Sequence, residues 1–502
     1  MNQQQTTWRL TPCAAVFRLT IAMGCAMACM LAGCKAGPDF RAPALPATDR
    51  YVATPQGAGT SADQAGTSAD QQSSAEQQRI ELGAHLSQDW WQLFQSAPLD
   101  EIVRRALAGN RTLQQAAATL AQARELAAAQ AGNRYPQVGM TAGTGAQKYG
   151  AEFLGSQFKV PAFGYFAVGP TVSYVLDYTG GVARSVEEQF ARAEYQHQQL
   201  NAAYLSVTGT AVAQALRVAL LREQIATIES LLADDRQNLQ LVRTAYEAGS
   251  VARVDTVSAE SQLASDETLL PPLRQQLDLA RHALAVILGQ DPAQALPADL
   301  DLAAVVLPQQ LPVSLPSELV RHRPDILASE AQLHAATAAV GVADANLYPH
   351  ITLTASGGQQ STTLSHLFDG ASSTWSVAGS LVGPLFDGGT LRAQKRAAVD
   401  ALQASAADYE QTVLVAFGQV ADSLQALQHD AEELEAQAHA QQAAGDNVEL
   451  TRRSYNEGNV GVLQVLDAER LYQNARLGYV RARGQRYLDT AQLFLALGGS
   501  PP

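Results

Sequence analysis

The sequence has little of several things, and each shortage excludes a class of protein. It contains 4 cysteines in 502 residues, and three of them precede Cys34. A chain cleaved before Cys34 would keep one cysteine, which excludes disulfides and a thiolate metal site. Positive charge is also scarce, since 34 Lys and Arg face 48 Asp and Glu, for a net charge of −14. Nucleic acid is therefore not an expected partner, because phosphate binding needs a basic face.

Recognised catalytic motifs are missing as well. The chain has no Walker loop, no H-E-x-x-H motif and no serine-nucleophile elbow, and its 9 histidines are scattered. Arg323-Pro324-Asp325 is typical of a helix start, because proline suits the first helical position and aspartate suits the first turn. We therefore expect no enzyme activity, no metal and no cofactor.

The first 34 residues have the features of a secretion signal. Arg9 and Arg18 supply positive charge, and the apolar run that ends at Gly33 is too short for a stable membrane-spanning helix. The run Leu31-Ala32-Gly33-Cys34 resembles the lipobox of bacterial lipoproteins, in which cleavage precedes the cysteine and lipid is attached to it. We predict a lipid anchor at Cys34, and a plain signal peptide with a chance cysteine is the alternative.

A low-complexity stretch follows the proposed anchor. Residues 35–80 are poor in large apolar side chains, and AGTSADQ occurs twice, at 58–64 and 65–71. Such a composition buries too little apolar surface to offset the entropy of ordering. We expect a flexible linker here.

The body of the chain repeats one plan. Tyr246 and Gly249 correspond to Tyr455 and Gly458, an offset of 209 positions. Each copy reads as a helix, two strands, a very long helix, a turn and a returning helix. The stretches 182–248 and 390–457 contain no proline, and at about 1.5 Å per residue each helix would be roughly 100 Å long. Pro271-Pro272 should break or kink the first returning helix.

Two pairs of strands are predicted, in residues 136–180 and 348–388. Within them, apolar residues share one phase of the strand, as listed here: Phe166, Val168, Val172, Tyr174 and Leu176, and then Trp375, Val377, Leu381 and Leu385. One apolar and one polar face is the pattern of a transmembrane β-strand, and an ordinary soluble hairpin pair is the alternative. Phe163, Tyr165 and Trp375 would then be interfacial aromatics.

Four strands do not close a barrel. An open sheet leaves edge N–H and C=O groups without partners in lipid, and bacterial barrels begin at about eight strands. Three chains with four strands each would supply twelve. We therefore predict a mixed α and β membrane protein, with a long α-helical barrel and a transmembrane 12-stranded β-barrel closed by homotrimerisation.

Several short motifs carry a resemblance to a known family. In chain order they are Gly37-Pro38-Asp39-Phe40, Asp89-Trp90-Trp91 with Leu93-Phe94, Tyr135-Pro136, Leu270-Pro271-Pro272-Leu273, Arg323-Pro324-Asp325-Ile326, Tyr348-Pro349 and Val465-Leu466-Asp467-Ala468-Glu469-Arg470. Their order and spacing resemble the TolC-like outer membrane factors of tripartite efflux pumps, in particular the NodT-type lipoproteins. The match covers nearly the whole mature chain.

The resemblance implies a function and a set of partners. We expect a homotrimeric exit duct, lipid-anchored in the bacterial outer membrane and extending into the periplasm. It would passively conduct drugs or small toxic molecules for a pump of the resistance-nodulation-division type. Its expected partners are outer membrane lipids, a periplasmic membrane fusion adaptor and an inner-membrane transporter. The alternatives are a duct for type I secretion and a trimeric surface coiled-coil protein without a pore.

The resemblance also implies an order of segments along the chain. They are a signal peptide (1–33), a lipid anchor and flexible linker (34–85), a first equatorial and helical segment (86–135), barrel hairpin 1 (136–180), the long and return helices of repeat 1 (181–290), an equatorial segment and helix (291–347), barrel hairpin 2 (348–388) and the long and return helices of repeat 2 (389–502).

The two repeated turns are the expected periplasmic tip, where the adaptor docks. Glycine permits the sharp reversal of the chain, although these glycines would also suit plain helix caps. The residues expected to dock the adaptor are Gly249, Ser250, Val251, Val254, Gly458, Val460, Gly461 and Leu463.

The same tip is the expected pore gate. Leu463 and Asp467 are four residues apart and so share a helix face. The resemblance places both at the constriction, and places Arg470 and Tyr455 where they tie neighbouring helices together. Threefold symmetry would converge three carboxylates, which would raise their pKa values or recruit cations. A plain Asp467–Arg470 pair on a solvated face is the alternative.

Overall fold

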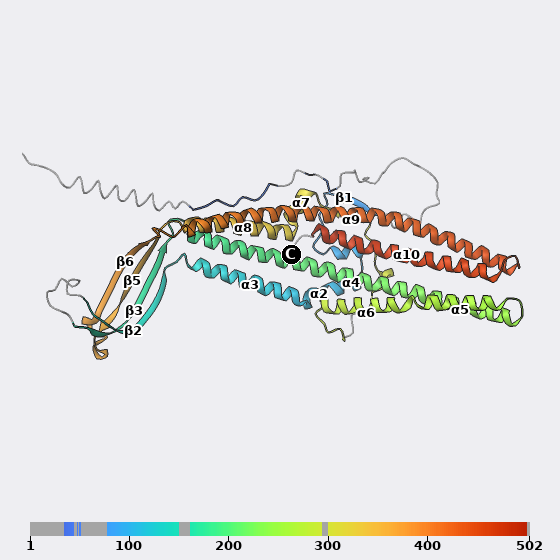
Figure 1. The fold of residues 1–502 in the computed structure, drawn as a ribbon, viewed down its shortest axis with the longest axis horizontal. Helices are drawn as coiled ribbons and strands as arrows, with labels where there is room; N and C mark the ends of the chain where they lie inside the picture. Colours follow the sequence, from blue (N-terminus) through green and yellow to red (C-terminus); the bar gives the residue numbers. More distant parts are fainter. Residues whose placement is uncertain are drawn as a thin grey trace, which may run out of the picture. The chain divides into compact units, whose positions relative to one another are not determined.

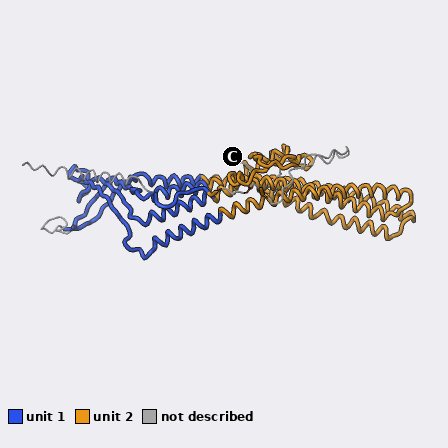
Figure 2. Tube along the Cα trace, turned by 90° about the horizontal axis from the view of Figure 1, so that it is seen from above, with its two compact units in different colours: residues 1–42, 121–194, 330–408 blue, residues 43–120, 195–329, 409–502 orange. Residues whose placement is uncertain are grey.

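The structure is a computed structural model that describes residues 35–44, 48, 50–51, 78–149, 161–293 and 300–498. The expected signal peptide, Cys34 and both AGTSADQ copies lie outside the described residues. The chain divides into two compact units (Figure 2). Unit 1 consists of residues 1–42, 121–194 and 330–408, and unit 2 of residues 43–120, 195–329 and 409–502.

Unit 1 contains an antiparallel sheet of four strands in the order β2-β3-β5-β6 (Figure 1). The strands are β2 (Gln137–Gln147), β3 (Phe163–Leu176), β5 (His350–Ser361) and β6 (Ser373–Val382). All four lie within the ranges in which alternation predicted strands. The central strands approach closely at Gly169, where an added Cβ would lie 2.1 Å from the Gly357 carbonyl oxygen. Glycine is therefore required there.

Two helices of 67 residues each, α4 (Gly181–Glu247) and α9 (Thr390–Asn456), begin in unit 1 residues and end in unit 2 residues. An aspartate caps the start of each. The Asp177 carboxylate accepts hydrogen bonds from the Val182 and Ala183 N–H groups, at 3.0 and 2.7 Å. The Asp387 carboxylate accepts from the N–H groups of residues 389 and 391, both at 2.9 Å. These bonds satisfy amides that a helix start leaves without partners.

Both long helices end in the same left-handed glycine cap. Gly249 and Gly458 have φ values of +75° and +77°, which glycine adopts without strain. Their N–H groups donate to the backbone carbonyl oxygens of Tyr246 and Tyr455, both at 2.9 Å. The expectation that these glycines cap helices is confirmed.

The returning helices differ between the two repeats. In the first, α5 (Arg253–Glu267) is separated from α6 (Leu270–Ile287), and Pro271 and Pro272 lie in the first turn of α6. In the second, α10 (Val462–Leu497) runs for 36 residues without a break. The expected break at the two prolines is confirmed, because proline lacks the N–H that would continue the earlier helix.

Unit 2 contains an aromatic core built from both ends of the chain. Trp90 and Phe94 lie on η2 (Trp90–Phe94) and pack against Phe494 of α10, with ring centroids 5.6 and 6.2 Å from it. The exposed fractions of the three side chains are 1%, 0% and 0%.

The remaining helices of the chain, taken over both units, are α2 (Ala97–Gly109), α3 (Arg111–Gly132), α7 (Pro316–His322), α8 (Pro324–Ala345) and three short 3-10 helices, η4 (Leu302–Ala304), η5 (Leu364–His366) and η6 (Gly370–Ser372).

The expected linker 34–85 is partly ordered, which corrects the prediction for that range. Strand β1 (Arg79–Leu82) pairs in parallel with β4 (Gln310–Val313). Ala36, Gly37 and Asp39 are also held by hydrogen bonds. Partners more than 140 residues away order both segments, and such contacts leave no mark on local composition.

Candidate functional site

The register of the sheet in unit 1 divides its side chains into two chemically different faces. Residues directly opposite each other in an antiparallel pair point to the same face. Val138 faces Val172, Val172 faces Ala355, and Ala355 faces Val377. The apolar positions of all four strands therefore share one face, whose members are Val138, Met140, Val168, Val172, Tyr174, Leu176, Ile351, Leu353, Trp375, Val377 and Leu381.

The opposite face is polar. It carries Thr141, Thr171, Ser173, Thr352, Thr354, Ser356, Ser376 and Ser380, and the hydroxyls of Ser356 and Ser376 lie 2.8 Å apart. Tyr165 also lies on this face, opposite Gly145, where its ring fills the space that a Cβ would occupy. Phe163 and Tyr165 are expected as interfacial aromatics, but their phase in β3 is opposite to that of Phe166, so they do not join an aromatic belt on the apolar face. Trp375 does lie on the apolar face.

Among the described residues, nothing covers the apolar positions of the outer strands β2 and β6. Trp375 is 81% exposed, and Val377, Met140 and Val138 are each more than 70% exposed. A continuous apolar patch of this kind is rare on a water-soluble monomer and marks a surface that meets a partner or a membrane.

Both edges of the sheet are also open. Among the described residues, β2 pairs with β3 alone and β6 with β5 alone. Each edge therefore presents a row of backbone N–H and C=O groups about ten residues long, which can continue the sheet into another chain.

At the tip, the expected docking residues divide into two sets. Of these, Val251 packs inward against Leu239, Val242 and Ala259, together with Val462, which was not among the expected residues. These contacts hold the two turns together. Gly249, Ser250, Val254, Gly458, Gly461 and Leu463 are exposed, with 64% exposure at Val254 and 43% at Leu463, and Val460 is half-buried. The exposed set offers two apolar side chains at the turns.

The expected gate residues all lie on or beside the start of α10. Leu463 and Asp467 are exposed on one face of the helix. Arg470 Nη2 lies 3.4 Å from Asp467 Oδ1, with side chains 48% and 73% exposed. This is the pairing that the sequence left open. Tyr455 is 39% exposed at the end of α9.

Sequence reasoning missed the neighbour of Arg470. Glu469 is 7% exposed, and its carboxylate accepts a hydrogen bond from Arg452 of α9 at 2.7 Å and another from Asn238 of α4. It therefore fastens α10 to both long helices near the tip. The sequence shows Glu469 as a carboxylate within the Val465–Arg470 motif. Its partners could not be identified there, because they lie 17 and 231 residues away in the chain.

Two carboxyl pairs also connect helices of unit 2. Burial, together with a hydrogen bond and charge repulsion from Asp266 of α5, raises the pKa of Asp235 on α4 to about 7. Burial and Asp489 of α10 in the same way raise the pKa of Asp430 on α9 to about 7. Each long helix is thus joined to a returning helix by carboxyls that share a proton below neutral pH. Among the described residues, no cluster of His, Cys, Asp and Glu is arranged to hold a metal ion.

Comparison with known proteins gives a consistent result. The family model described as "Outer membrane efflux protein" matches residues 102–290 and 315–499. The antibiotic efflux pump outer membrane protein ArpC of Pseudomonas putida is 28% identical over 471 residues, which cover 94% of this chain and 93% of that protein. Outer membrane protein OprJ of Pseudomonas aeruginosa is 30% identical over 493 residues, with 94% of each chain covered. The solved structure of the outer-membrane channel OprN superposes with a TM-score of 0.81 and 28% identity, over 93% of this chain and 99% of that one.

Proposed function

The chain belongs to the outer membrane efflux protein family, and from this membership we propose that it is the exit duct of a tripartite efflux pump. Three copies close one channel, with a 12-stranded barrel in the outer membrane and a helical tunnel in the periplasm. The duct passively conducts drugs or small toxic molecules supplied by an inner-membrane transporter of the resistance-nodulation-division type.

The observation that carries this proposal is the sheet of unit 1. Its uncovered apolar face suits the hydrocarbon of a membrane, and its polar face suits a water-filled lumen. The backbone groups at its open edges need hydrogen-bond partners in lipid. The β2 edge of one chain can provide these partners by pairing with the β6 edge of the next chain. Three such chains close the ring without a remaining edge.

A conductance measurement tests the proposal. The purified oligomer, placed in a planar bilayer, should form water-filled pores. Deletion of the gene should raise the susceptibility of the cell to antibiotics and dyes, which separates drug efflux from type I secretion. An oligomer that never conducts would support a surface coiled-coil protein instead.

The gate follows from the same closure. Three copies of Asp467 around one axis would form a ring of carboxylates beside a ring of Leu463, and would favour cations. Arg470 and Tyr455 would hold neighbouring helices in the closed state. Asp467→Ala should raise the conductance of the isolated channel, while Asp446→Ala, an exposed carboxylate of α9, should leave it unchanged. An unchanged conductance for the first variant would remove Asp467 from the gate.

The tip would receive the periplasmic adaptor. The exposed Val254 and Leu463 offer apolar contacts for another helical hairpin, and the small residues Gly249, Ser250, Gly458 and Gly461 allow its close approach. Val254→Asp with Leu463→Asp should abolish drug export while the channel still assembles. Export at the level of the unaltered protein would place the docking surface elsewhere.

The lipid anchor completes the proposal. Cys34 would carry acyl chains after cleavage of residues 1–33, and several chains together give firm attachment. Labelled palmitate should enter the protein and should not enter the Cys34→Ser variant.

A further inference from the structure

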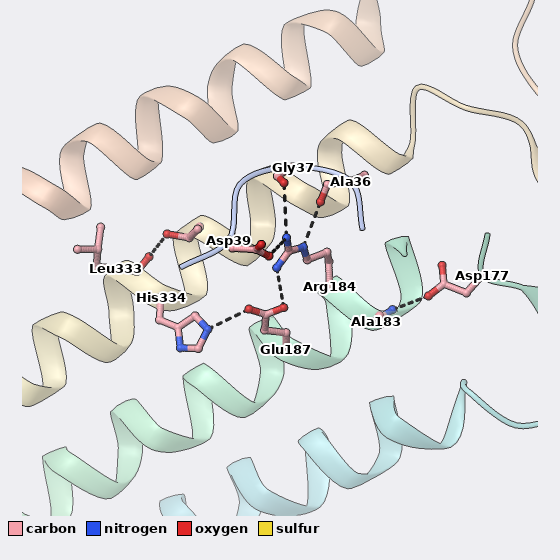
Figure 3. A network of polar contacts seen from close by, with 10 residues as sticks. Ala36, Gly37, Asp39, Asp177, Ala183, Arg184, Glu187, Leu333 and His334 are labelled. Carbon is pink, nitrogen blue, oxygen red and sulfur yellow. Dashed lines mark hydrogen bonds and ion pairs between the residues drawn. The ribbon is translucent and has the colours of Figure 1, made fainter. Parts of the chain in front are cut away.

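The segment that follows Cys34 is bound to the body of unit 1 (Figure 3). The Ala36 N–H donates to the Thr179 carbonyl oxygen at 2.9 Å, between the end of β3 and the start of α4. Arg184 of α4 donates from Nε to the Ala36 carbonyl oxygen at 3.1 Å and from Nη2 to Asp39 Oδ1 at 2.6 Å. These bonds join positions nearly 150 residues apart in the chain.

Arg184 is a buried cation whose partners come partly from this segment. Its side chain is 1% exposed, and within its own helix it donates to Glu187 Oε2 at 2.9 Å. The hydrogen bond and charge of Arg184 lower the pKa of Asp39, so this carboxyl stays ionised. Removal of the segment would take the Asp39 carboxylate and the Ala36 carbonyl oxygen away from Arg184 and leave Glu187 as the carboxylate bound to it.

The fit also depends on two glycines. Gly37 has a φ of +78°, and a Cβ added to it would lie 2.4 Å from the Cα of Gly341 on α8. A Cβ on Gly341 would in turn lie 2.8 Å from the Ala36 carbonyl oxygen. The backbone of the segment therefore lies directly on the backbone of α8, and any larger side chain at either position would separate them.

An aromatic contact holds the far end of the segment. The Phe40 ring stacks on His334 of α8, with centroids 4.3 Å apart and an interplanar angle of 15°. His334 Nε2 lies 3.1 Å from Glu187 Oε1, so the stacking partner is joined to the same carboxylate that pairs with Arg184. The segment 35–40 is thus held by an ion pair, by close backbone packing and by ring stacking.

We propose that Arg184, Gly341 and His334 form a receptor on α4 and α8 for the segment Lys35–Phe40, and that this receptor fixes the lipid anchor at the end of β3. The ligand is a short peptide with a glycine, a carboxylate and an aromatic ring at positions 37, 39 and 40. The inference rests on the proposed acylation of Cys34.

The receptor sets the distance between the anchor and the sheet. The Lys35 Cα lies 3.0 Å from the Cβ position of Gly180, and the next Cα along a chain is about 3.8 Å away. The described segment therefore begins beside the junction between the sheet and α4, and the proposed acyl chains are attached one residue before it in the sequence. The AGTSADQ repeats follow the bound segment in the sequence, so their length does not alter this distance.

Trypsin gives a direct test, because Lys35 and Arg41 bracket the bound segment. The full-length protein labelled with palmitate is digested in detergent, and release of label from the body is followed in time. In the unaltered protein the label should be released slowly. Gly37→Ala and Arg184→Met should each release it about tenfold faster or more, since losing a charged or closely packed contact shifts a local opening equilibrium by that factor. Arg192→Met is the matched control, because Arg192 lies on the same helix with its side chain 57% exposed.

Each outcome separates the receptor from the anchor. Gly37→Ala changes the segment and leaves the helices intact, so a failure to fold does not obscure the result. Equal rates of release from the unaltered protein and both variants would overturn the receptor. Incorporation of the label before digestion would still support acylation of Cys34. If no label enters the protein, acylation is wrong, and mass spectrometry of the tryptic N-terminal peptides then measures docking alone. Deletion of residues 58–71 should leave the release rate unchanged, and a faster rate would overturn the claim that the linker does not set the distance.

Discussion

Trp90 in unit 2 and Trp375 in unit 1 are the same type of residue in opposite environments. Trp90 is 1% exposed and packs against Phe494, whereas Trp375 is 81% exposed on the apolar face of the sheet. The core of unit 2 removes its aromatic residues from water by folding of the chain itself. The sheet of unit 1 leaves equally apolar residues exposed among the described parts of the chain.

The difference teaches which interactions stabilise each region. Burial of a large apolar side chain contributes about 1.5–3 kcal/mol, and the core of unit 2 gains this within one chain. In the proposed trimer, the sheet would make the same gain against the membrane and the neighbouring chains. The four predictions below test this contrast, from the largest expected effect to the smallest.

Phe494→Ala should have the largest effect on stability. The side chain is fully buried between Trp90 and Phe94, and its removal leaves a cavity that costs about 3–5 kcal/mol. Chemical denaturation in detergent measures the loss. Trp375→Ala is the matched change in the sheet and should cost much less, because it opens no cavity within the chain. Equal losses would mean that the two regions are stabilised in the same way.

Val377→Arg should prevent stable insertion in the outer membrane. Val377 lies on the apolar face, and a charge on the lipid side of a barrel costs about 2–4 kcal/mol near the middle of the bilayer. Ser376→Arg, one residue earlier on the polar face, should be tolerated. Fractionation of membranes and a heat-modifiability gel measure the folded, inserted protein. If Ser376→Arg proves the more harmful change, the assignment of the two faces is reversed.

Arg323→Met tests the polar part of the unit 2 core. Arg323 is 7% exposed, and its Nη1 donates to the Ala496 carbonyl oxygen at 2.8 Å. Methionine preserves the volume but leaves that buried carbonyl without a partner, which costs about 1–3 kcal/mol. Arg321→Met, at an exposed position of α7, is the control for loss of charge. Similar melting temperatures for both variants would show that the buried hydrogen bond contributes nothing.

The carboxyl pairs should make the stability of unit 2 depend on pH. Because the pKa values of Asp235 and Asp430 are raised to about 7, the folded chain keeps these protons between about pH 4 and 7, whereas the unfolded chain has released them. Stability should therefore fall as pH rises through this window. The effect should be the smallest of the four, because both side chains are partly exposed and solvent screens their charges.

Melting temperatures at pH 5 and pH 8 measure this dependence. The double variant Asp235→Asn, Asp430→Asn should show a smaller difference between the two temperatures. Asp278→Asn, an exposed carboxylate on α6, should keep the full difference. A double variant that keeps it too would place the titrating groups elsewhere.

The sequence predicted features that depend on neighbours along the chain. Alternation located β3 and β6, the repeated glycines located the helix ends at Gly249 and Gly458, and the two prolines located the break before α6. Each follows from local geometry, which a few consecutive residues determine.

Features that depend on distant partners were not predictable. The pairing of Arg184 with Asp39 and of Glu469 with Asn238 joins segments 145 and 231 residues apart, and no periodic pattern marks such contacts. The position of Tyr165 was misread for another reason. Its aromatic type suggested an interfacial residue, but its phase in β3 decides its face, and that phase is the polar one.

The central claim is that the sheet of unit 1 is completed by other chains. Native mass spectrometry of the detergent-solubilised protein tests this claim most directly. The account predicts a dominant species of three chains, which open β2 and β6 edges would produce by pairing in a ring. A sample that contains monomers alone, while still folded, would contradict it.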